Sequence, residues 1–438
     1  MSTPGTAVYR ETIEALNKLR HTAKVSSDAS PLSWSDADAA EIEKIARRHR
    51  QQTDHLHHVW RGKSNGKFEH TRGVYLEAFT TRICATVRAF AKTRRRGSLR
   101  DICEFAERLN VWEVLWEPVR VGLHPKSKGG FRKITRSGCR RMAQQFIVRD
   151  LLTALDLDNE YDYSRRGAGG EKAMIGDVCQ RMQDGYSDWQ TVDIKECFAS
   201  LRPAHFGWLP IPKKLIRNVV FLPECAKIGI DARSIRLALA DAYAVLTGNT
   251  SGGVEVIRSI TRKVRRELPQ GSVLSPLVAR AFVGRELRAA LGTEEVARFS
   301  FVDDLTLGAR SQPKVEESLE ALRARLLGNP AGPVLLHVNP PTSTKQGRVR
   351  VFGYVLEPGL GYGGNPVHVH PDHDRFDRFH KRLYARWKKG DGSTDPEVFV
   401  LEHLDRWIRS QRAWTLVPTY SRNLAFTRAV IYLYEAGI

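Results

Sequence analysis

The most informative segment of the chain is Phe299-Ser300-Phe301-Val302-Asp303-Asp304-Leu305-Thr306-Leu307-Gly308. It holds two short apolar runs that alternate in the manner of β-strands, with adjacent aspartates at their junction. This pattern predicts a β-hairpin with Asp303 and Asp304 at its tip. Neighbouring carboxylates repel, so such a pair is stable chiefly where it is solvated or where a cation neutralises it. Taken alone, an ordinary Asp-Asp turn explains the pair as well as a metal site does.

Another aspartate ends an earlier apolar strand, in Val192-Asp193-Ile194-Lys195-Glu196-Cys197-Phe198. Aspartates at strand ends often cap the next helix, so Asp193 by itself is uninformative. Phosphoryl transfer to a 3′-hydroxyl, however, requires two Mg²⁺ ions about 4 Å apart, bridged by carboxylates from separate strands. Asp193 and Asp303 could supply that bridge.

A Pro-Gln-Gly loop lies between these two segments, in Leu268-Pro269-Gln270-Gly271-Ser272, and an apolar helix is expected from about Ser275 to Leu291. Glycine lets the backbone approach a substrate closely, and Gln270 can hydrogen-bond a template or an incoming nucleotide. As an isolated string the loop is a weak signal.

The three segments, in this order, resemble the palm motifs of reverse transcriptases. Further matches to that family lie at Lys126, Gly129, Arg132, Lys133, Arg140, Arg141, Gln145, Tyr163 to Gly167, Leu335 to Asn339, Lys345 and Phe352 to Leu356. The resemblance covers roughly residues 119 to 357. It implies an α+β chain with the right-hand polymerase fold, in which palm and fingers carry the chemistry.

The resemblance also implies roles for individual residues. The catalytic carboxylates would be Asp193, Asp303 and Asp304, and two Mg²⁺ ions, with Mn²⁺ as a substitute, would be held by Asp193, Ile194, Asp303 and Asp304. A deoxynucleoside triphosphate would meet Lys126, Arg132, Phe198, Gln270 and Lys345. Nucleic acid would meet Lys133, Arg140, Arg141, Arg262, Arg265 and Arg266.

A physical argument that does not depend on the resemblance also applies to Phe198. An aromatic ring packed under the sugar leaves neither room nor a hydrogen-bond partner for a ribose 2′-hydroxyl, which favours deoxynucleotides. Related RNA-dependent RNA polymerases commonly have an acid there, and a glycine where this chain has Val302. Both differences indicate DNA synthesis, although core packing is an alternative explanation for the ring.

The overall charge favours a polyanionic partner. The 438 residues include 69 Lys and Arg against 49 Asp and Glu, a formal net charge of +20. Nucleic acid is the first candidate. No apolar stretch approaches the roughly 20 residues of a membrane-spanning helix, and Met1 to Arg20 lacks the apolar core of a signal peptide. We therefore expect an intracellular protein that does not bind membrane. The resemblance further implies a bacterial cytoplasmic enzyme, with RNA template, DNA product and deoxynucleoside triphosphates as partners.

Periodicity divides the chain into three expected domains. For residues 1–118 we predict a helical N-terminal extension. A capping box at Ser35 opens a helix that runs to about Gln51, and further helices are expected from Gly73 to Lys92 and from Ser98 to Trp116. Residues 119–357 predict the fingers and palm. Residues 358–438 predict a helical, thumb-like C-terminal domain. Neither the six scattered cysteines nor the histidine clusters at His55 to His58 and His368 to His373 fit a common zinc pattern.

The type of reverse transcriptase that the chain resembles is inferred by excluding other types. The 76 residues between Asp193 and Gln270 exceed those of compact enzymes, and no nuclease pattern follows. A defence-associated bacterial enzyme that copies a dedicated non-coding RNA fits best, with retron and group II intron enzymes as related alternatives. Two other classes stay open: a catalytically silent RNA-binding scaffold, and a polymerase primed by a hydroxyl of its own, such as that of Tyr420, Tyr432 or Tyr434.

Overall fold

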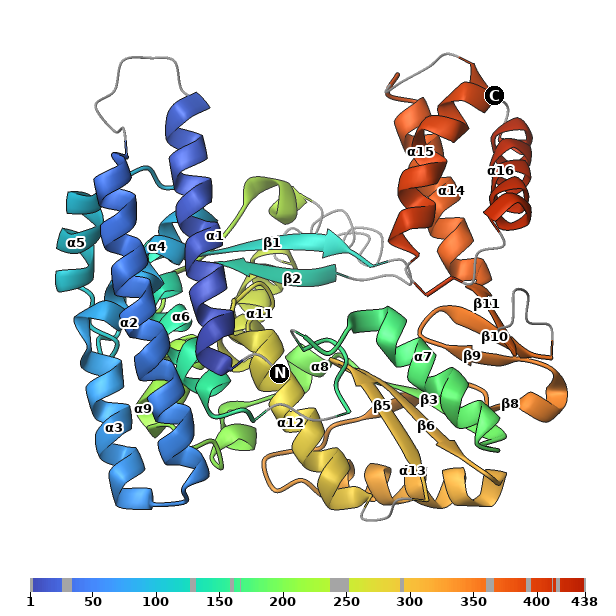
Figure 1. Cartoon of the computed structure of the whole chain (residues 1–438), viewed down its shortest axis with the longest axis horizontal. Coiled ribbons are helices and arrows are strands. Elements are labelled where there is room, and N and C mark those ends of the chain that lie inside the picture. The colour runs from blue at the N-terminus through green and yellow to red at the C-terminus, as the bar shows by residue number, and fades with distance from the viewer. Residues whose placement is uncertain are drawn as a thin grey trace. The chain divides into compact units, whose positions relative to one another are not determined.

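The computed structural model describes residues 3–25, 34–126, 131–157, 161–165, 167–236, 252–291, 295–359, 366–390, 395–411, 413–414 and 418–436. The chain forms two compact units, each assembled from separate stretches of sequence (Figure 1). The first unit takes in Met1–Asn159, Glu196–Arg285 and Leu327–Val334, and the second takes in Glu160–Lys195, Glu286–Leu326 and Leu335–Ile438. The expected mixture of helices and sheets is confirmed. The division into three consecutive domains stays a prediction.

Helices make up the N-terminal part of the first unit. They are α1 (Pro4–Val25), α2 (Asp36–Arg61), α3 (Asn65–Glu77), α4 (Phe79–Thr93), α5 (Leu99–Glu107) and α6 (Cys139–Ala154). The capping box at Ser35 is confirmed, since its hydroxyl accepts from the Asp38 N–H and the Asp38 carboxylate accepts from the Ser35 N–H. The helix expected from Gly73 to Lys92 is in fact two, because Ala78 adopts an extended conformation.

The helix expected from Ser98 to Trp116 was predicted too long. It ends at Glu107, and the Asn110 side chain then accepts a hydrogen bond from the Trp112 N–H at 2.9 Å. Such a local side-chain bond competes with helical bonding and favours a turn. The sequence stays amphipathic beyond this point, which explains the error.

A buried ion pair ties α4 to α6. The Arg88 guanidinium donates to both carboxylate oxygens of Asp150, and both side chains are almost fully buried. Burial alone would raise the pKa of Asp150, but the paired Arg88 outweighs it and holds that pKa below its ordinary value. Removing one partner of such a pair typically costs about 3–5 kcal/mol. The helical bundle therefore depends on this contact for its packing.

A small sheet follows the bundle in the first unit, with strand order β2-β1-β4. Its strands are β1 (Val119–Pro125), β2 (Phe131–Arg136) and β4 (Ile228–Ile230), and β1 pairs antiparallel with β2 and parallel with β4. Val119, Val121 and Leu123 of β1 pack into one apolar cluster with residues of the later segments. Arg120 and His124, on the opposite face of β1, are exposed, whereas Gly122 between them is buried.

The long insert after Asp193 folds mainly into short helical turns of the first unit. It contains α8 (Cys197–Ser200), η1 (Pro203–Phe206), α9 (Lys213–Leu215), the π-helical η2 (Ile216–Val220) and, before the Pro-Gln-Gly loop, α11 (Gly252–Arg266). Phe206 and Phe221 pack together at 5.7 Å between ring centroids. Much of the helix expected near Ile235 to Leu246 falls outside the described residues.

A five-stranded sheet forms the centre of the second unit, in the order β5-β6-β3-β7, with β8 also paired to β3. Its strands are β3 (Asp188–Ile194), β5 (Ala297–Phe301), β6 (Asp304–Ala309), β7 (Leu336–Val338) and β8 (Thr342–Ser343). Gly308 of β6 lies opposite Trp189 of β3, and a Cβ at Gly308 would overlap the indole ring. Glycine is thus required there so that Trp189 can be buried.

Helices and a second sheet complete this unit (Figure 1). The helices are α7 (Gly170–Gln183), α13 (Gln312–Leu327), α14 (His373–Trp387), α15 (Pro396–Ser410) and α16 (Pro418–Glu435); α12 (Ser275–Ala290) runs across the boundary between the units. The sheet is β11-β10-β9, from β9 (Val349–Val351), β10 (Tyr354–Pro358) and β11 (Val367–Pro371). The last three helices share an aromatic core around Phe376, Phe379 and Trp407. None of the helices in the described ranges is long and apolar enough to cross a membrane.

Candidate active site

The predicted hairpin with the paired aspartates is confirmed. Phe301 at the end of β5 pairs with Asp304 at the start of β6, so only Val302 and Asp303 form the turn. Val302 has a φ of 63°, in the left-handed region that β-branched residues rarely adopt. Strain of this kind costs about 1–3 kcal/mol and is concentrated at functional sites. The turn that carries Asp303 is therefore held against the preference of its own sequence.

Asp193 comes to the same end of the sheet from β3. Asp193 and Asp304 are register partners on adjacent antiparallel strands, and cross-strand partners lie about 4.5–5.5 Å apart. The next residue, Ile194, donates its N–H to the Asp303 carbonyl at 3.2 Å. Sequence positions more than a hundred residues apart are thus brought together as the sequence predicted.

The three carboxylates influence one another electrically. Partial burial raises the pKa of Asp304 to about 7, and the charges of Asp303 and Asp193 add to the shift. Asp304 is nevertheless exposed to solvent. Repulsion from the two neighbouring carboxylates is therefore an essential cause of the raised pKa, beside desolvation. A divalent cation would remove that repulsion, which is the property expected of a metal site.

The donor set fits magnesium in its chemistry, because Mg²⁺ prefers carboxylate oxygens and binds through few protein ligands. Ile194 could offer only its main-chain carbonyl. Within the described ranges, however, no three His, Cys, Asp or Glu side chains already stand in a metal-binding arrangement. The site therefore fits a metal by charge and ligand type, and its side chains would have to converge on binding.

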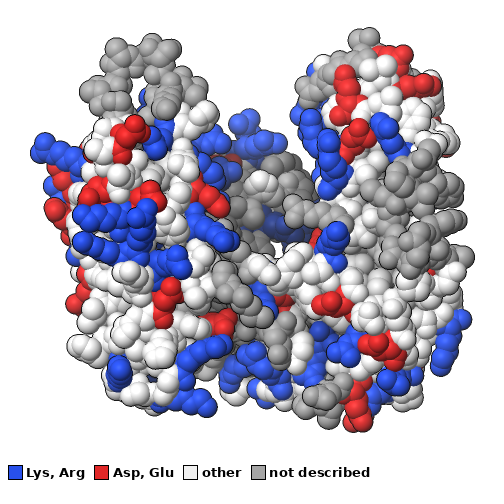
Figure 2. Space-filling model, viewed as in Figure 1, with Lys and Arg blue, Asp and Glu red and all other residues white. Residues whose placement is uncertain are grey.

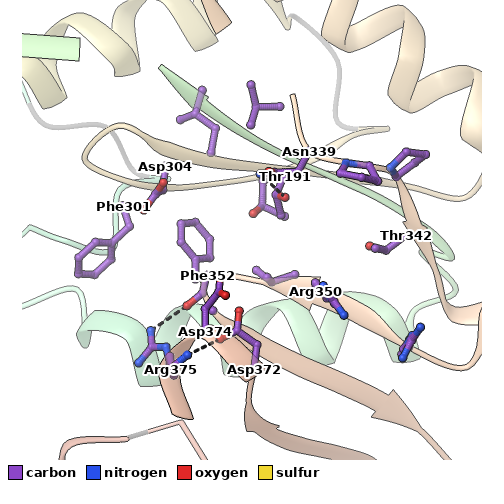
Figure 3. A pocket seen from close by; sticks show the side chains of 18 of the residues that line it. Thr191, Phe301, Asp304, Asn339, Thr342, Arg350, Phe352, Asp372, Asp374 and Arg375 are labelled. Atoms are coloured by element: carbon purple, nitrogen blue, oxygen red, sulfur yellow. Dashed lines mark hydrogen bonds between the residues drawn. The ribbon is translucent and has the colours of Figure 1, made fainter. Parts of the chain in front are cut away.

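A cavity of about 700 Å³ opens beside Asp304 (Figure 3). Thr191, Thr306 and Asn339 line its sheet side, and the Asn339 amide donates to the Thr191 hydroxyl at 3.1 Å. Phe301 and Phe352 line it as well, with ring centroids 6.4 Å apart. Four arginines complete the lining, namely Arg348, Arg350, Arg375 and Arg378. The cavity thus joins one carboxylate of the acidic hairpin to a group of cations.

Arg375 organises the far wall of this cavity. Its guanidinium donates to the Phe352 carbonyl at 2.7 Å, to Glu171 at 3.1 Å and to the Gln411 side chain at 3.0 Å. It also lies over the Tyr354 ring, 4.1 Å from the centroid. One side chain therefore fixes the turn between β9 and β10 to α7 and to the end of α15.

The residues expected to bind triphosphate lie in the first unit. Lys126 donates to Glu196 at 3.1 Å, and the Lys126 hydrogen bond holds the pKa of Glu196 below its ordinary value. The Glu196 side chain is exposed and that of Lys126 is partly exposed. Such pairs contribute only about 0–1 kcal/mol, so a phosphate could replace Glu196 at little cost. Arg132 is exposed on β2. Both cations are thus open to an anionic ligand.

The Pro-Gln-Gly loop is fixed to β2. The Gln270 carbonyl accepts from both the N–H and the hydroxyl of Thr135, at 2.6 and 2.7 Å. Gly271 has a φ of 98°, and a Cβ there would overlap the Thr135 carbonyl. The Gln270 side chain remains partly exposed. Glycine therefore allows the close approach that holds Gln270 in place.

Phe198 lies in α8, directly after the left-handed Glu196. Its ring is half-buried rather than part of a closed core. Its carbonyl accepts from the Leu268 N–H at 2.9 Å, which links it to the Pro-Gln-Gly loop. The ring is thus accessible, as a sugar-contacting residue must be.

Among the other residues predicted to contact nucleic acid, some side chains are exposed and others already bond to groups of the protein. Arg262 and Arg266 are exposed on α11, and Arg265 donates to the Ala226 carbonyl at 3.2 Å. Lys133 pairs with the buried Glu267 at 2.5 Å, and Arg140 donates to the Arg108 carbonyl. These last two side chains have structural partners, so any contact with nucleic acid would compete with them.

Arg141 is placed differently from the prediction. It is 1% exposed and donates to the carbonyls of Asn218 and Phe221, at 3.0 and 2.6 Å. Its guanidinium therefore holds the end of η2, and we leave it out of the proposed interface with nucleic acid. The basic sequence around it gave no sign of burial, since neighbouring Arg140 is partly exposed.

No protein-family model matches the chain, and no curated protein matches it. Among solved structures, it is similar to telomerase from Candida albicans in complex with a fragment of telomeric RNA, with a TM-score of 0.35 and 12% identity over 74% of this chain and 56% of that chain. It is similar to apo telomerase from Candida tropicalis, truncated from its C-terminal domain, with a TM-score of 0.30 and 13% identity over 59% and 55%. The chain thus spans just over half the length of these matches. The candidate site rests on its own residues.

Sequence reasoning missed the cationic wall of the cavity. Arg350 lies in β9 and Arg348 comes directly before this strand, while Arg375 and Arg378 are three residues apart on α14. A spacing of two in extended chain and of three in a helix places side chains on one face, which is a signal the sequence contained. Lys345, the residue that was singled out, is exposed in η3 (Thr344–Gln346), and its neighbour Gln346 lines the cavity instead.

The tyrosines considered as protein primers have different surroundings. Tyr434 is 57% exposed on α16, whereas Tyr432 stacks on His380 with 4.8 Å between centroids. The side chain of Tyr420 lies outside the described residues. Only Tyr434 of the two described side chains is freely presented to solvent.

Proposed function

We propose that the chain is an RNA-directed DNA polymerase, a reverse transcriptase with a palm, fingers and a thumb-like set of C-terminal helices. The observation that carries the proposal is the placement of Asp193 opposite Asp304 with Asp303 in the adjoining turn. Carboxylates from two strands that meet at a strained hairpin are suited to two-metal phosphoryl transfer. Their order along the chain and the surrounding segments match the motifs of that family.

In the proposed reaction the 3′-hydroxyl of a primer attacks the α-phosphorus of a deoxynucleoside triphosphate. A new P–O bond forms, the bond to the β-phosphate oxygen breaks, and pyrophosphate leaves. Two bound Mg²⁺ ions, or Mn²⁺, would lower the pKa of the attacking hydroxyl and offset the charge of the phosphates. Asp193, Asp303 and Asp304 would hold these ions, with the main-chain carbonyl of Ile194 as a further oxygen ligand.

The first unit would bind the nucleotide. Lys126 and Arg132 would take the triphosphate, and the accessible Phe198 ring would exclude a 2′-hydroxyl. Gln270, fixed through its own backbone, would contact template or nucleotide, and the exposed Lys345 of the second unit would add positive charge. Replacing Phe198 by Ala should therefore allow the enzyme to use ribonucleotides. Unchanged discrimination between the two sugars would show that Phe198 does not exclude the 2′-hydroxyl.

The biological setting is a further part of the proposal. We infer a bacterial cytoplasmic enzyme that copies a dedicated structured RNA into DNA in antiviral defence, with retron and group II intron enzymes as the related alternative. The high net charge supports an RNA partner, while the defence role rests on the resemblance and on the exclusion of nuclease-bearing types.

The deciding experiment uses the full chain purified from a native-like host. Co-purifying RNA is sequenced, and Mg²⁺ with labelled deoxynucleotides is added to wild type, to an Asp303→Asn, Asp304→Asn double variant and to Asp184→Asn. Asp184 is an exposed acid of the same unit outside the site and serves as the matched control. DNA complementary to the RNA should be made by the wild type and by the control alone.

Other outcomes identify the alternatives. RNA bound equally by all three proteins, with no DNA made even from a supplied template-primer, would show a silent scaffold. DNA that stays covalently attached to the protein after denaturation would show protein priming and would direct attention to exposed tyrosines such as Tyr434.

A further inference from the structure

A narrow groove runs between α14 and α15, away from the acidic hairpin and outside every motif considered above. Four residues from each helix line it. They are Phe379, Arg382, Leu383 and Arg386 of α14, and His403, Arg406, Trp407 and Ser410 of α15. The spacing is the same on both helices, so each presents one continuous face to the groove.

The lining combines an aromatic floor with a cationic rim. Phe379 and Trp407 stack at 4.5 Å between centroids and form the floor together with Leu383. These three side chains are almost fully buried, so only their edges face the groove. Arg382, Arg386 and Arg406 are exposed at the rim. A ligand would thus find apolar contact below and positive charge around it.

The lining of the groove contains three arginines and no Asp or Glu. Across the residues that the structure describes, Arg382, Arg386 and Arg406 form no ion pair, and the hydrogen bond recorded for Arg382 goes to the Arg378 carbonyl. By contrast, the cavity beside Asp304 mixes its arginines with four acids. An uncompensated cluster of guanidinium groups is suited to phosphate, which it can bind in a bidentate manner.

The size of the groove narrows the class of ligand. Its volume is about 230 Å³, below the roughly 300–1,000 Å³ of sites for drug-sized molecules. A duplex cannot enter, whereas one nucleotide can place its phosphate on the rim and the edge of its base or sugar on the floor. Guanidinium planes also stack on unpaired bases. Inorganic phosphate alone would make no contact with the apolar floor, so it would not account for that part of the groove.

We propose that this groove binds a single unpaired nucleotide of a single-stranded nucleic acid, with its phosphate held by Arg382, Arg386 and Arg406. Figure 2 shows Lys and Arg side chains gathered along one side of the C-terminal helices, as an approaching strand requires. The inference depends on the groove alone and does not require that the chain synthesises DNA.

The test compares two double variants that remove the same charge from the same helices. Arg386→Ala with Arg406→Ala removes groove cations. Lys381→Ala with Arg409→Ala removes exposed cations that do not line the groove. Binding of a short labelled single-stranded oligoribonucleotide is followed by fluorescence anisotropy over a series of salt concentrations, with the full chain throughout.

The groove variant should bind at least about 10-fold more weakly than the control variant, since charge-assisted contacts contribute about 1.5–3 kcal/mol each. Its salt dependence should be shallower by about 0.7 in log–log slope, because the two arginines share one phosphate and each lost phosphate contact on a single strand lowers the slope by about that amount. An oligonucleotide with abasic sites should bind wild type and control more weakly than the intact strand, and this difference should vanish in the groove variant.

Equal loss in both double variants would reduce the effect to net charge and overturn the proposal. So would displacement of the strand by polyglutamate as readily as by unlabelled RNA, because the groove would then accept any polyanion. Melting temperatures of both variants check that the exposed substitutions leave folding intact. The readout is strand binding alone and involves no synthesis, so failure of the polymerase proposal and failure of this one are seen separately.

Discussion

Two hairpins of the second unit begin their turns in the same left-handed region but differ in how the turn continues and in what holds it. The β5–β6 turn has Val302 at a φ of 63°, and the β9–β10 turn has Phe352 at 52°. Each is a turn of two residues between paired strand ends. The second residue of the β9–β10 turn is Gly353, with a φ of 76°, whereas Asp303, the second residue of the β5–β6 turn, does not have a positive φ. The β9–β10 turn thus has the glycine that its left-handed second position favours, and the β5–β6 turn has its strain at Val302.

The supports of the two turns also differ. Arg375 donates to the Phe352 carbonyl, and the Asp372 N–H donates to the Gly353 carbonyl at 2.9 Å. The β5–β6 turn is linked to β3 by the Ile194 N–H, and its carboxylates repel one another. The β9–β10 turn, with its glycine and its hydrogen bonds from the start of α14, is thus a stable structural turn. Strain and like charges that are kept together in a turn are expected where the charges serve the proposed function.

The largest effect should come from Asp304→Asn. Removing one metal-binding carboxylate should lower the rate of nucleotide addition about 10³-fold, since metal stabilisation of the transition state amounts to several kcal/mol. The melting temperature should rise slightly, because repulsion is relieved. Primer extension and thermal unfolding measure the two effects. A fall in both would mean that Asp304 is structural.

Arg375→Ala should lower the free energy of unfolding by about 3 kcal/mol, because it removes charge-assisted bonds and leaves the half-buried Glu171 without its partner. Arg378→Ala is the matched control, since Arg378 lines the same cavity from the same helix but is exposed. Chemical denaturation should show little change in the control. Hydrogen exchange at the β9–β10 turn should speed up only in Arg375→Ala.

Gly353→Ala should destabilise the chain by about 2 kcal/mol. The new methyl group would meet a left-handed φ and would lie 2.6 Å from the Arg375 Nε, whose side chain is held by several bonds. Gly359→Ala, also at a positive φ but with open space around it, separates the two contributions. Similar losses in both variants would show that backbone strain alone matters.

A weaker effect should appear as a pH dependence of stability in the presence of a chelator. The pKa of Asp304 is raised to about 7 from its ordinary 3.8, so the unfolded chain loses this proton first as the pH rises. Stability should therefore fall between about pH 4 and pH 7, by about 1 kcal/mol once solvent screening of an exposed group is allowed for. Melting curves of Asp304→Asn should lack this fall, whereas those of Gly353→Ala should retain it.

The sequence predicted the acidic hairpin well because its signals are local. Alternation around Asp303 and the apolar run before Asp193 each specify a strand, and the motif order specifies which strands meet. It could not predict which cations face the site. Arg375 is conspicuous only after α14 and the β9–β10 turn have been brought together, and Arg141 is buried by an insert some 80 residues later. Tertiary contacts of that range leave no periodic trace.

The smallest effect, Val302→Gly, distinguishes strain that serves a function from strain that is incidental. Glycine should relieve about 1–2 kcal/mol of left-handed strain but lose about 0.5–1 kcal/mol of that gain to its greater freedom when unfolded. A net gain of about 0.5 kcal/mol in the free energy of unfolding is expected. Primer extension should nevertheless slow several-fold, because a freer turn places Asp303 less accurately. If activity instead rose together with stability, the strain at Val302 would not help to position Asp303. The functional difference between the two hairpins would then lie only in the aspartates of the β5–β6 turn.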